Sequence, residues 1–448
     1  MTSAGGTPAP GHEPPQLPRQ LTTSGLVVHY ITSVMGAGVL LIPALAWAEA
    51  GPLSLVAWGL LILYSYPFAL IFAKLSVRHP TSKGVAQFVE AAFGARAGRI
   101  AAVFLLITLL AGNPVLGLAA GRYLLSAVDP SASNRAALLA GAAVIVFCVA
   151  LNLWGIKVST RAQMVVLGTV VLLLAVVICL ALPKGDYTRL TPFAPHGWSA
   201  LGTTLLICFF GFIGWENAAP VAEEVRDPER TFPQGILYAV SCVGLLYFAM
   251  AFTVSVALPA SPASHSGGSG QSDLTAFVRL LQVATGTGLR SSGFLVAGVL
   301  LLLTTNAWCL GTSRLVFALA RDGLLPAKLS RLTARGRIPT RAVLALLPGY
   351  AVSVVVLLVT DSSETALIKA SSATYLLIFL MAFLSAARLL PRGGTARLNL
   401  AVIAATVAML PFFGVSLVIA LAMLLLSVIA ERCLRKRVTP PTETGVLT

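Results

Sequence analysis

Long apolar runs are the feature of this sequence that most constrains its fold. Windows of about 19 residues find twelve of them, each close to the roughly 20 residues that a helix needs to cross a bilayer. They cover residues 24–48, 53–76, 98–127, 135–153, 161–182, 198–219, 234–258, 291–318, 341–359, 365–386, 397–412 and 415–431. Only 10% of the residues are charged and 57% are hydrophobic, whereas a soluble chain keeps about a quarter of its residues charged. The sequence therefore predicts an all-α polytopic membrane protein with 12 transmembrane helices embedded in a lipid bilayer.

The basic residues predict the orientation of these spans. The net charge is +15, from 31 basic and 16 acidic residues, and the positive charges stand in short clusters between apolar runs. That placement is typical of loops held on the cytoplasmic side, so we expect no nucleic-acid partner. With both termini inside, the outer loops hold only seven basic residues and the other 24 are cytoplasmic, which predicts a cell (inner, cytoplasmic) membrane protein with both termini in the cytoplasm. The seven are Arg122, Arg135, Lys184, Arg189, Arg279, Arg290 and Lys369.

The same pattern divides the chain. Residues 1–21 contain five prolines and predict a disordered cytoplasmic tail. The membrane domain is expected over 22–432, and 433–448 form a cytoplasmic C-terminal tail. Within the domain we group spans one to five (about 24–182), six to ten (about 198–386) and eleven to twelve (about 397–431). Two amphipathic helices are expected outside the spans, in 84–94 at the inner interface and after Ser272 at the outer vestibule.

Glycines interrupt spans one and six. Span one carries TSVMGAGVLLIP, with Gly36 and Gly38 before Pro43, and span six carries FFGFIGWENAAP, with Gly211 and Gly214. Glycine pairs in membrane helices also serve close helix packing, which is the alternative for span one. Because spans one and six are the first of each group of five, a matched pair of interruptions points to a transporter site at the membrane midplane.

The backbone hydrogen-bonding groups that unwinding leaves unpaired suggest what such a site binds. Unwound segments free polar groups that are costly in hydrocarbon unless a ligand satisfies them. Freed N–H groups around Ala37–Val39 would attract a carboxylate, and freed carbonyls of Phe210–Ile213 would accept from an ammonium. An α-amino acid offers both groups, although a polyamine or another amine would also satisfy the second.

Five motifs in collinear order resemble the amino acid-polyamine-organocation superfamily. They are MGAGVLLIPALAWAEAGP, RHPTSKGVAQFVEAAFG, LNLWGIKVSTRAQ, GFIGWENAAPVAEEVRDPERTFPQGI, and SRLVFALARDGLLP with RIPTRAV, within about residues 22–390. Within the superfamily the chain most resembles bacterial exporters of L-methionine and branched-chain amino acids. The resemblance implies a 5+5 inverted-repeat transporter fold with discontinuous helices 1 and 6, and alternating access around a central site.

The resemblance also implies the site residues. The substrate carboxylate would lie at Ser33, Gly36, Ala37 and Gly38, although Ala37 replaces the hydroxyl residue of many members. An aromatic gate and amine-binding carbonyls would be supplied by Phe209, Phe210, Phe212 and Ile213, beside the glycine break at Gly214. Trp308 would line the site from span eight, although its spacing alone favours a core aromatic.

Polar residues inside the spans have two readings each. Glu216 costs at least ~2.5 kcal/mol to ionise in the bilayer, so it is either a proton-coupling or gating residue or a cap for N–H groups of the break. His29 is either a hydrogen-bonded buried histidine or a proton relay. Asn113 and Asn306 either join helices or line the pocket.

These observations predict a secondary active transporter of small, apolar amino acids, exporting them by proton-coupled alternating access. The alternatives are an importer or exchanger on the same scaffold and a membrane sensor that binds an amino acid without transport. Sodium is an alternative coupling ion because Thr304, Thr305, Thr312 and Ser313 offer hydroxyls. The chain lacks the phosphate-binding, zinc-protease and serine-hydrolase motifs, and its cysteines show no metal spacing, so we expect no enzyme activity, no cofactor and no metal.

Overall fold

The computed structural model describes residues 21–79, 83–129, 131–154, 160–219, 225–258, 276–333, 338–360 and 364–437. The two predicted tails lie largely outside these ranges. The helices are α1 Thr23–Leu40, α2 Ile42–Ala50, α3 Ser54–Arg78, α4 Val85–Phe93, α5 Ala95–Val128, α6 Asn134–Trp154, α7 Thr160–Ala181, α8 Ala200–Phe210, α9 Pro228–Ala257, α10 Ala276–Thr285, α11 Arg290–Arg321, α12 Thr340–Leu344, α13 Leu346–Thr360, α14 Glu364–Leu389, α15 Gly394–Met409 and α16 Gly414–Arg437. No strand is present in these ranges beyond one isolated bridge, between Leu21 and Val225.

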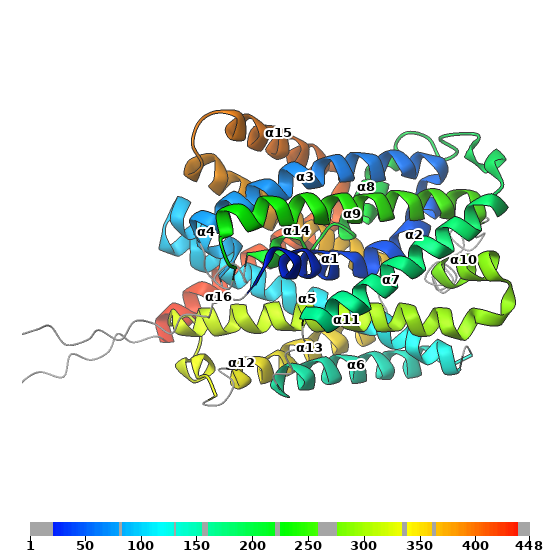
Figure 1. Cartoon of the computed structure of the whole chain (residues 1–448). Coiled ribbons are helices and arrows are strands. Elements are labelled where there is room, and N and C mark those ends of the chain that lie inside the picture. The colour runs from blue at the N-terminus through cyan, green and yellow to red at the C-terminus, as the bar shows by residue number, and fades with distance from the viewer. Residues whose placement is uncertain are drawn as a thin grey trace, which may run out of the picture.

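The long helices lie side by side as a bundle (Figure 1). The start of α1 and the end of α16 lie toward the end of the bundle that carries α4, and α10 lies at the opposite end. α5 and α11 pack along each other through the middle, α1 packs against α9 and α11, and α8 packs against α2, α3 and α14. This arrangement brings spans one, three, six, eight and ten around one centre.

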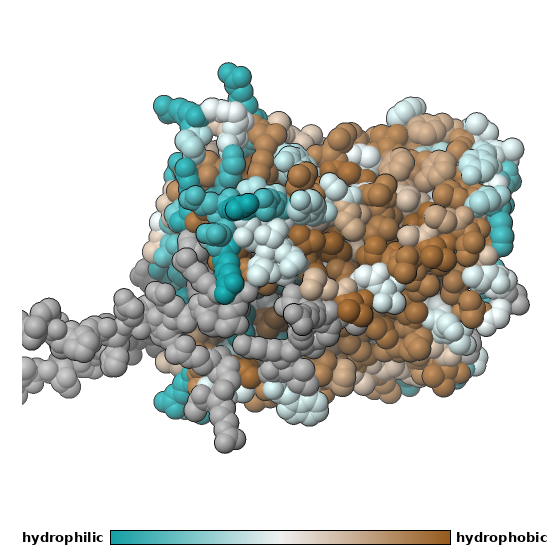
Figure 2. Space-filling model, in the orientation of Figure 1, coloured by the Kyte–Doolittle hydropathy of each residue, from teal (hydrophilic) through white to brown (hydrophobic). Residues whose placement is uncertain are grey.

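Apolar side chains cover the outside of the bundle. Figure 2 shows a broad hydrophobic band across the visible face, with hydrophilic residues gathered at its two ends. Six large apolar side chains among the described residues are more than 70% exposed: Leu63, Val128, Leu139, Leu245, Val359 and Val415. Exposing this much apolar surface to water is unfavourable, whereas lipid solvates it.

Each of the twelve predicted runs contains a described helix or a pair of helices. Eight helical stretches among the described residues are long and apolar enough to cross a membrane, and three shorter apolar helices accompany them. α15 and α16 form one such stretch, Gly394–Leu434, although Gly414 with its positive φ of 48° separates them. The all-helical membrane architecture is confirmed, and the count of twelve spans stays a prediction.

The interruption of span one lies elsewhere than predicted. α1 continues as a helix through Gly36 and Gly38 to Leu40, and α2 begins at Ile42 with Pro43 in its first turn. Proline lacks the N–H group and its ring clashes with the carbonyl four residues before it. Pro43, rather than the glycines, therefore accounts for the break between Leu40 and Ile42. The prediction of free N–H groups around Ala37–Val39 is wrong.

Both amphipathic segments form helices beside the bundle. In α4, Val85, Phe88 and Val89 are buried whereas Phe93 is exposed, so its apolar face packs inward except at the end of the helix. In α10, Phe277, Leu280 and Leu281 are buried. The Lys184 ammonium group after α7 donates to the carbonyls of Val283 and Ala284 at 2.9 and 2.8 Å, which fastens the end of α10.

Candidate functional site

The interruption of span six creates space in the centre of the bundle. α8 ends at Phe210, and Gly211–Gly214 form turns before the short 3₁₀ turn Trp215–Ala218. Gly214 has a φ of 135°, which residues with a Cβ rarely adopt. A Cβ there would also lie 2.7 Å from the carbonyl oxygen of Ser33. The predicted break is confirmed, and glycine is required because the turn lies directly against α1.

A buried tyrosine joins the break to α1. The Tyr247 hydroxyl of α9 lies 2.7 Å from the Val34 carbonyl oxygen and 2.8 Å from that of Gly211, so it donates to one of the two. A Cβ at Gly38 would overlap this tyrosine, and one at Gly36 would lie 2.6 Å from the Thr304 hydroxyl oxygen. The glycines of span one thus serve close packing, which was the alternative interpretation.

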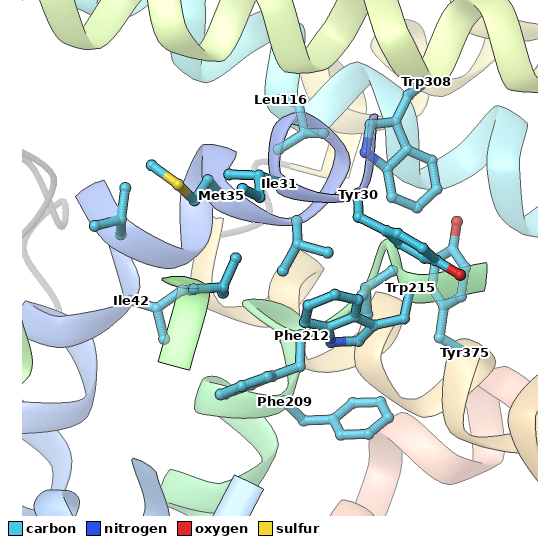
Figure 3. Close-up of a cluster of buried hydrophobic side chains, with 14 of the residues drawn as sticks. Tyr30, Ile31, Met35, Ile42, Leu116, Phe209, Phe212, Trp215, Trp308 and Tyr375 are labelled. Atoms are coloured by element: carbon cyan, nitrogen blue, oxygen red, sulfur yellow. The ribbon is translucent and has the colours of Figure 1, made fainter. Parts of the chain in front are cut away.

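A cavity with an empty volume of about 390 Å³ lies between α1, the break, α5, α11 and α14. Six predicted site residues line it: Ser33, Gly38, Asn113, Phe210, Ile213 and Trp308. Figure 3 shows the buried side chains around this region, with Trp308 and Leu116 on one side of α1 and Phe212 and Trp215 on the other. The cavity therefore lies between the break of span six, which its glycines predict, and the continuous part of α1.

The walls offer hydrogen-bonding groups but no charged side chain among the described lining residues. The Ser33 hydroxyl is buried without a hydrogen-bond partner, and the Trp308 indole N–H donates to the Ser33 carbonyl at 3.2 Å. Asn113 uses its amide group to donate to the hydroxyl oxygens of Thr312 at 2.8 Å and Tyr350 at 2.9 Å. An unpaired buried hydroxyl costs free energy, so Ser33 is available to a polar ligand. A ligand that enters this cavity must be neutral or carry balanced charges.

The carbonyls of the break are partly occupied. The Phe209 carbonyl accepts from the Phe212 amide at 2.9 Å, the Phe210 carbonyl accepts from the Ile213 amide at 3.2 Å, and Gly211 faces Tyr247. A carbonyl oxygen has two lone pairs. Of these residues, Phe210 lines the cavity, and its carbonyl can therefore accept one further hydrogen bond.

Several predicted site residues lie behind the cavity wall. Phe209 packs against Phe379 with 5.9 Å between ring centroids, and Phe212 packs against Trp58 at 5.7 Å. Gly36, Gly214 and Glu216 do not line the cavity either. The side chain of Ala37 lies outside the described residues. Of this group, the aromatic residues support the wall, and contact with substrate stays a prediction for all of them.

The sequence reasoning missed six lining residues. Two of them, Ser371 and Tyr375, belong to α14, and the Tyr375 ring lies 5.8 Å from that of Trp308. The signal was present as the run SSATY inside an apolar span, where hydroxyls four residues apart share one helix face. The six are Val34, Gly112, Leu116, Thr304, Ser371 and Tyr375.

Glu216 is buried, with 5% of its surface exposed. One carboxylate oxygen, Oε2, accepts from the Gly214 amide at 2.9 Å, so this side chain caps the break. The other, Oε1, has no hydrogen-bond partner. Glu216 lines a second cavity, with an empty volume of about 350 Å³, rather than the first. The capping interpretation is confirmed, and a role in proton coupling stays a prediction.

The other polar candidates divide between the two readings. Asn306 accepts from the Asn152 amide of α6 at 2.9 Å, so it joins two helices. His29 is half-buried in α1. All four hydroxyls considered for sodium donate within α11. The Thr304 hydroxyl, which lies 3.1 Å from the Leu300 carbonyl, also lies 3.4 Å from the Thr32 carbonyl of α1.

Comparison with known proteins identifies the family. The family described as "Amino acid permease" matches residues 20–433. The chain belongs to the amino acid permease family. It is 30% identical to the uncharacterized amino acid permease YecA of Bacillus subtilis over 84% of this chain and 87% of that relative. It is 29% identical to the L-methionine/branched-chain amino acid exporter YjeH of Escherichia coli, over 80% and 83%. Identity to the branched-chain amino acid permease BcaP of Bacillus subtilis is 25%, over 72% and 71%.

Membership of this family indicates what kind of protein contains the central cavity. This permease is a multi-pass membrane transporter of amino acids and not an enzyme. The described lining of the cavity at the break of span six combines the unpaired Ser33 hydroxyl with aromatic and aliphatic walls.

Proposed function

We propose that this permease exports small, apolar amino acids from the cell in exchange for protons, by alternating access around the cavity at the break. The observation that carries the substrate class is the lining of that cavity. It provides aromatic and aliphatic walls, Phe210, Ile213 and Trp308, with hydroxyl and amide groups and no charged side chain among its described residues. An arginine or polyamine substrate would bring an uncompensated positive charge into this apolar space, which is costly.

The substrate's two charged groups would bind at different sides of the cavity. The ammonium group would donate to the carbonyl of Phe210, and the carboxylate would accept from the Ser33 hydroxyl near Gly38. The apolar side chain would then lie against Trp308, Ile213 and Tyr375. The exporter YjeH, which its name assigns to L-methionine and branched-chain amino acids, supports this choice of substrates and this direction.

We also infer the membrane arrangement from the predicted pattern. The twelve apolar runs form twelve spans in the cytoplasmic membrane, with spans one to five and six to ten as inverted repeats and both termini in the cytoplasm. This is supported by the breaks after Leu40 and Phe210, which fall in the first span of each proposed half. The start of α1 and the end of α16 also lie toward the same end of the bundle (Figure 1).

Counterflow in proteoliposomes tests the substrate class. Vesicles loaded with unlabelled methionine or leucine should accumulate the labelled amino acid, whereas vesicles loaded with arginine should not accumulate labelled arginine. An inward proton gradient should accelerate methionine efflux from loaded vesicles. The variant Glu216→Gln should lose this acceleration and the exposed control Glu229→Gln should keep it. Arginine preference contradicts the substrate class, and efflux indifferent to pH and to Glu216→Gln contradicts proton coupling.

Import is the second candidate, because the relative BcaP is named a branched-chain amino acid permease and direction follows from gradients rather than from the scaffold. Efflux and uptake measured under equal and opposite gradients separate the two. A sensor without transport is the remaining alternative, and saturable flux through the purified protein excludes it.

A further inference from the structure

The second cavity lies apart from the lining of the first and is bounded by different helices. Its lining residues are Gly84 and Val85 at the start of α4, Leu105 and Leu109 of α5, Glu216, and Gly311 and Leu315 of α11. No residue lines both cavities. Among the described lining residues, the Glu216 carboxyl is the one polar side chain, and it is buried.

The carboxyl group of Glu216 has one occupied and one open oxygen. Oε2 is held by the Gly214 amide, which fixes the orientation of the group. Oε1 is buried and has no hydrogen-bond partner. A buried charge without a partner is expensive, so this oxygen carries either a proton or a bound cation.

From this geometry we propose that the second cavity binds a primary ammonium group carried on an apolar chain, and that this ammonium and a proton compete for Oε1 of Glu216. The ammonium supplies three N–H donors, and Leu105, Leu109 and Leu315 match a branched or linear aliphatic tail. The inference rests on the proposed export function, in which the amine is that of the substrate amino acid on the α4 side of the break.

The competition gives exchange a physical basis. When the ammonium binds, the Glu216 carboxylic acid releases its proton to the solution, and a carboxylate–ammonium pair forms. When the amine leaves, the carboxylate takes up a proton. Because one oxygen serves both, the two occupants exclude each other. Substrate and proton then occupy this cavity in alternation, as exchange requires.

Other titratable and charged groups surround this carboxyl from the elements packed around it. Tyr375 of α14 interacts electrostatically with Glu216, and Tyr30 of α1 packs against the neighbouring Trp215 with 5.6 Å between centroids. Lys83, next to the lining residue Gly84, pairs with Glu90 at 2.8 Å and Asp322 at 2.5 Å. The α5 and α11 walls contribute aliphatic side chains and a glycine. Among the described residues, Glu216 is therefore the acidic group that lines the cavity itself.

Proton release on binding tests the proposal. Purified protein in weakly buffered detergent solution is titrated with 3-methylbutylamine, an amine on an apolar chain, and with leucine, across about pH 5 to 8. The wild type should release up to one proton for each amine bound, with an apparent affinity that rises with pH. The neutral isostere 3-methylbutanol should neither bind nor release protons.

Two variants locate the site. Glu216→Gln keeps an acceptor for the Gly214 amide but loses the charge, so it should bind the amine about 10- to 100-fold more weakly, which corresponds to the worth of a charged hydrogen bond, and should release no proton. Leu109→Phe fills the cavity without touching the carboxyl and should also weaken amine binding. Glu229→Gln, an exposed control, should behave as the wild type.

The outcomes separate this inference from the proposed function. If amine binds without proton release, or if both Glu216→Gln and Leu109→Phe bind it as tightly as the wild type, the second site is refuted while leucine counterflow by the wild type still supports transport. If leucine binds with proton release but the wild type shows no counterflow, the site stands and the export function fails.

Discussion

At the scale of single residues, two positions hold the centre of this permease together: a glycine that no larger residue can replace and a buried tyrosine that bridges two segments. Gly214 has a positive φ, and the Ser33 carbonyl occupies the place where a Cβ would project. Tyr247 places one hydroxyl between the carbonyls of α1 and the break. Both hold the break against α1, so both are testable by one-residue changes.

Gly214→Ala should disrupt the break. The backbone conformation alone costs a residue with a Cβ about 1–3 kcal/mol, and the added carbon would approach the Ser33 carbonyl within 2.7 Å. We expect at least a tenfold loss of counterflow or a loss of folded protein on size exclusion. Gly168→Ala in α7, where a Cβ would meet nothing within 4 Å, is the matched control and should transport normally. Full activity of Gly214→Ala would show that the break tolerates movement.

Tyr247→Phe should lower stability while leaving the aromatic packing. The ring would still contact Trp58 and Phe212, but the carbonyls of Val34 and Gly211 would lose a buried donor, at a cost of about 1–3 kcal/mol. Thermal unfolding in detergent should show a lower Tm than the wild type. Tyr66→Phe, an exposed tyrosine of α3, should leave the Tm unchanged. An equal Tm for both variants would contradict the bridging role.

At the scale of helices, periodicity and hydropathy predicted where the helices lie but not where the helix of span one is interrupted. All twelve apolar runs contain helices, and the break at Gly211–Gly214 was found from its glycines. The same reasoning failed at Gly36 and Gly38, since glycine marks either an unwound backbone or a close contact, and only the partners Thr304 and Tyr247 decide between them. Ser371 and Tyr375 were missed because a polar pair on one helix face does not reveal which neighbour it faces.

Glu431 should fasten the last helix to the core. It is 2% exposed in α16 and accepts from the Arg99 guanidinium of α5 at 2.9 Å. Removing one partner of a fully buried pair costs about 3–5 kcal/mol, and the 33% exposure of Arg99 reduces this. Glu431→Gln should therefore lower the Tm, whereas Glu229→Gln should not. Since neither residue lines the cavity, substrate affinity at low temperature should stay unchanged. A weaker affinity in Glu431→Gln would place α16 in the transport cycle.

At the scale of the whole molecule, ion pairs connect elements at opposite ends of the bundle. At one end Lys83 joins Glu90 of α4 to Asp322 after α11, and at the other Lys369 of α14 lies 3.9 Å from Glu49 of α2. Partial burial lowers the pKa of Lys83, but its hydrogen bonds and charge interactions with Asp322 and Glu90 outweigh this, so the pKa is raised. The amine therefore stays protonated throughout the physiological range, and its pairing is not switched off by rising pH there.

Lys83→Gln should open the α4 end of the bundle. Two partly exposed pairs contribute together about 0.4–2 kcal/mol, which corresponds to a shift of about 2- to 30-fold in the population of the open state. A cysteine introduced at Leu315, in a variant whose native cysteines are replaced, should react correspondingly faster with a membrane-impermeant thiol reagent from that side. Lys369→Gln should instead accelerate labelling of a cysteine at Ser371 from the opposite side. Each variant removes one lysine, so each serves as the control for the other. If either variant accelerated labelling equally at both cysteines, the bundle would have loosened in general, and neither ion pair would act as a gate.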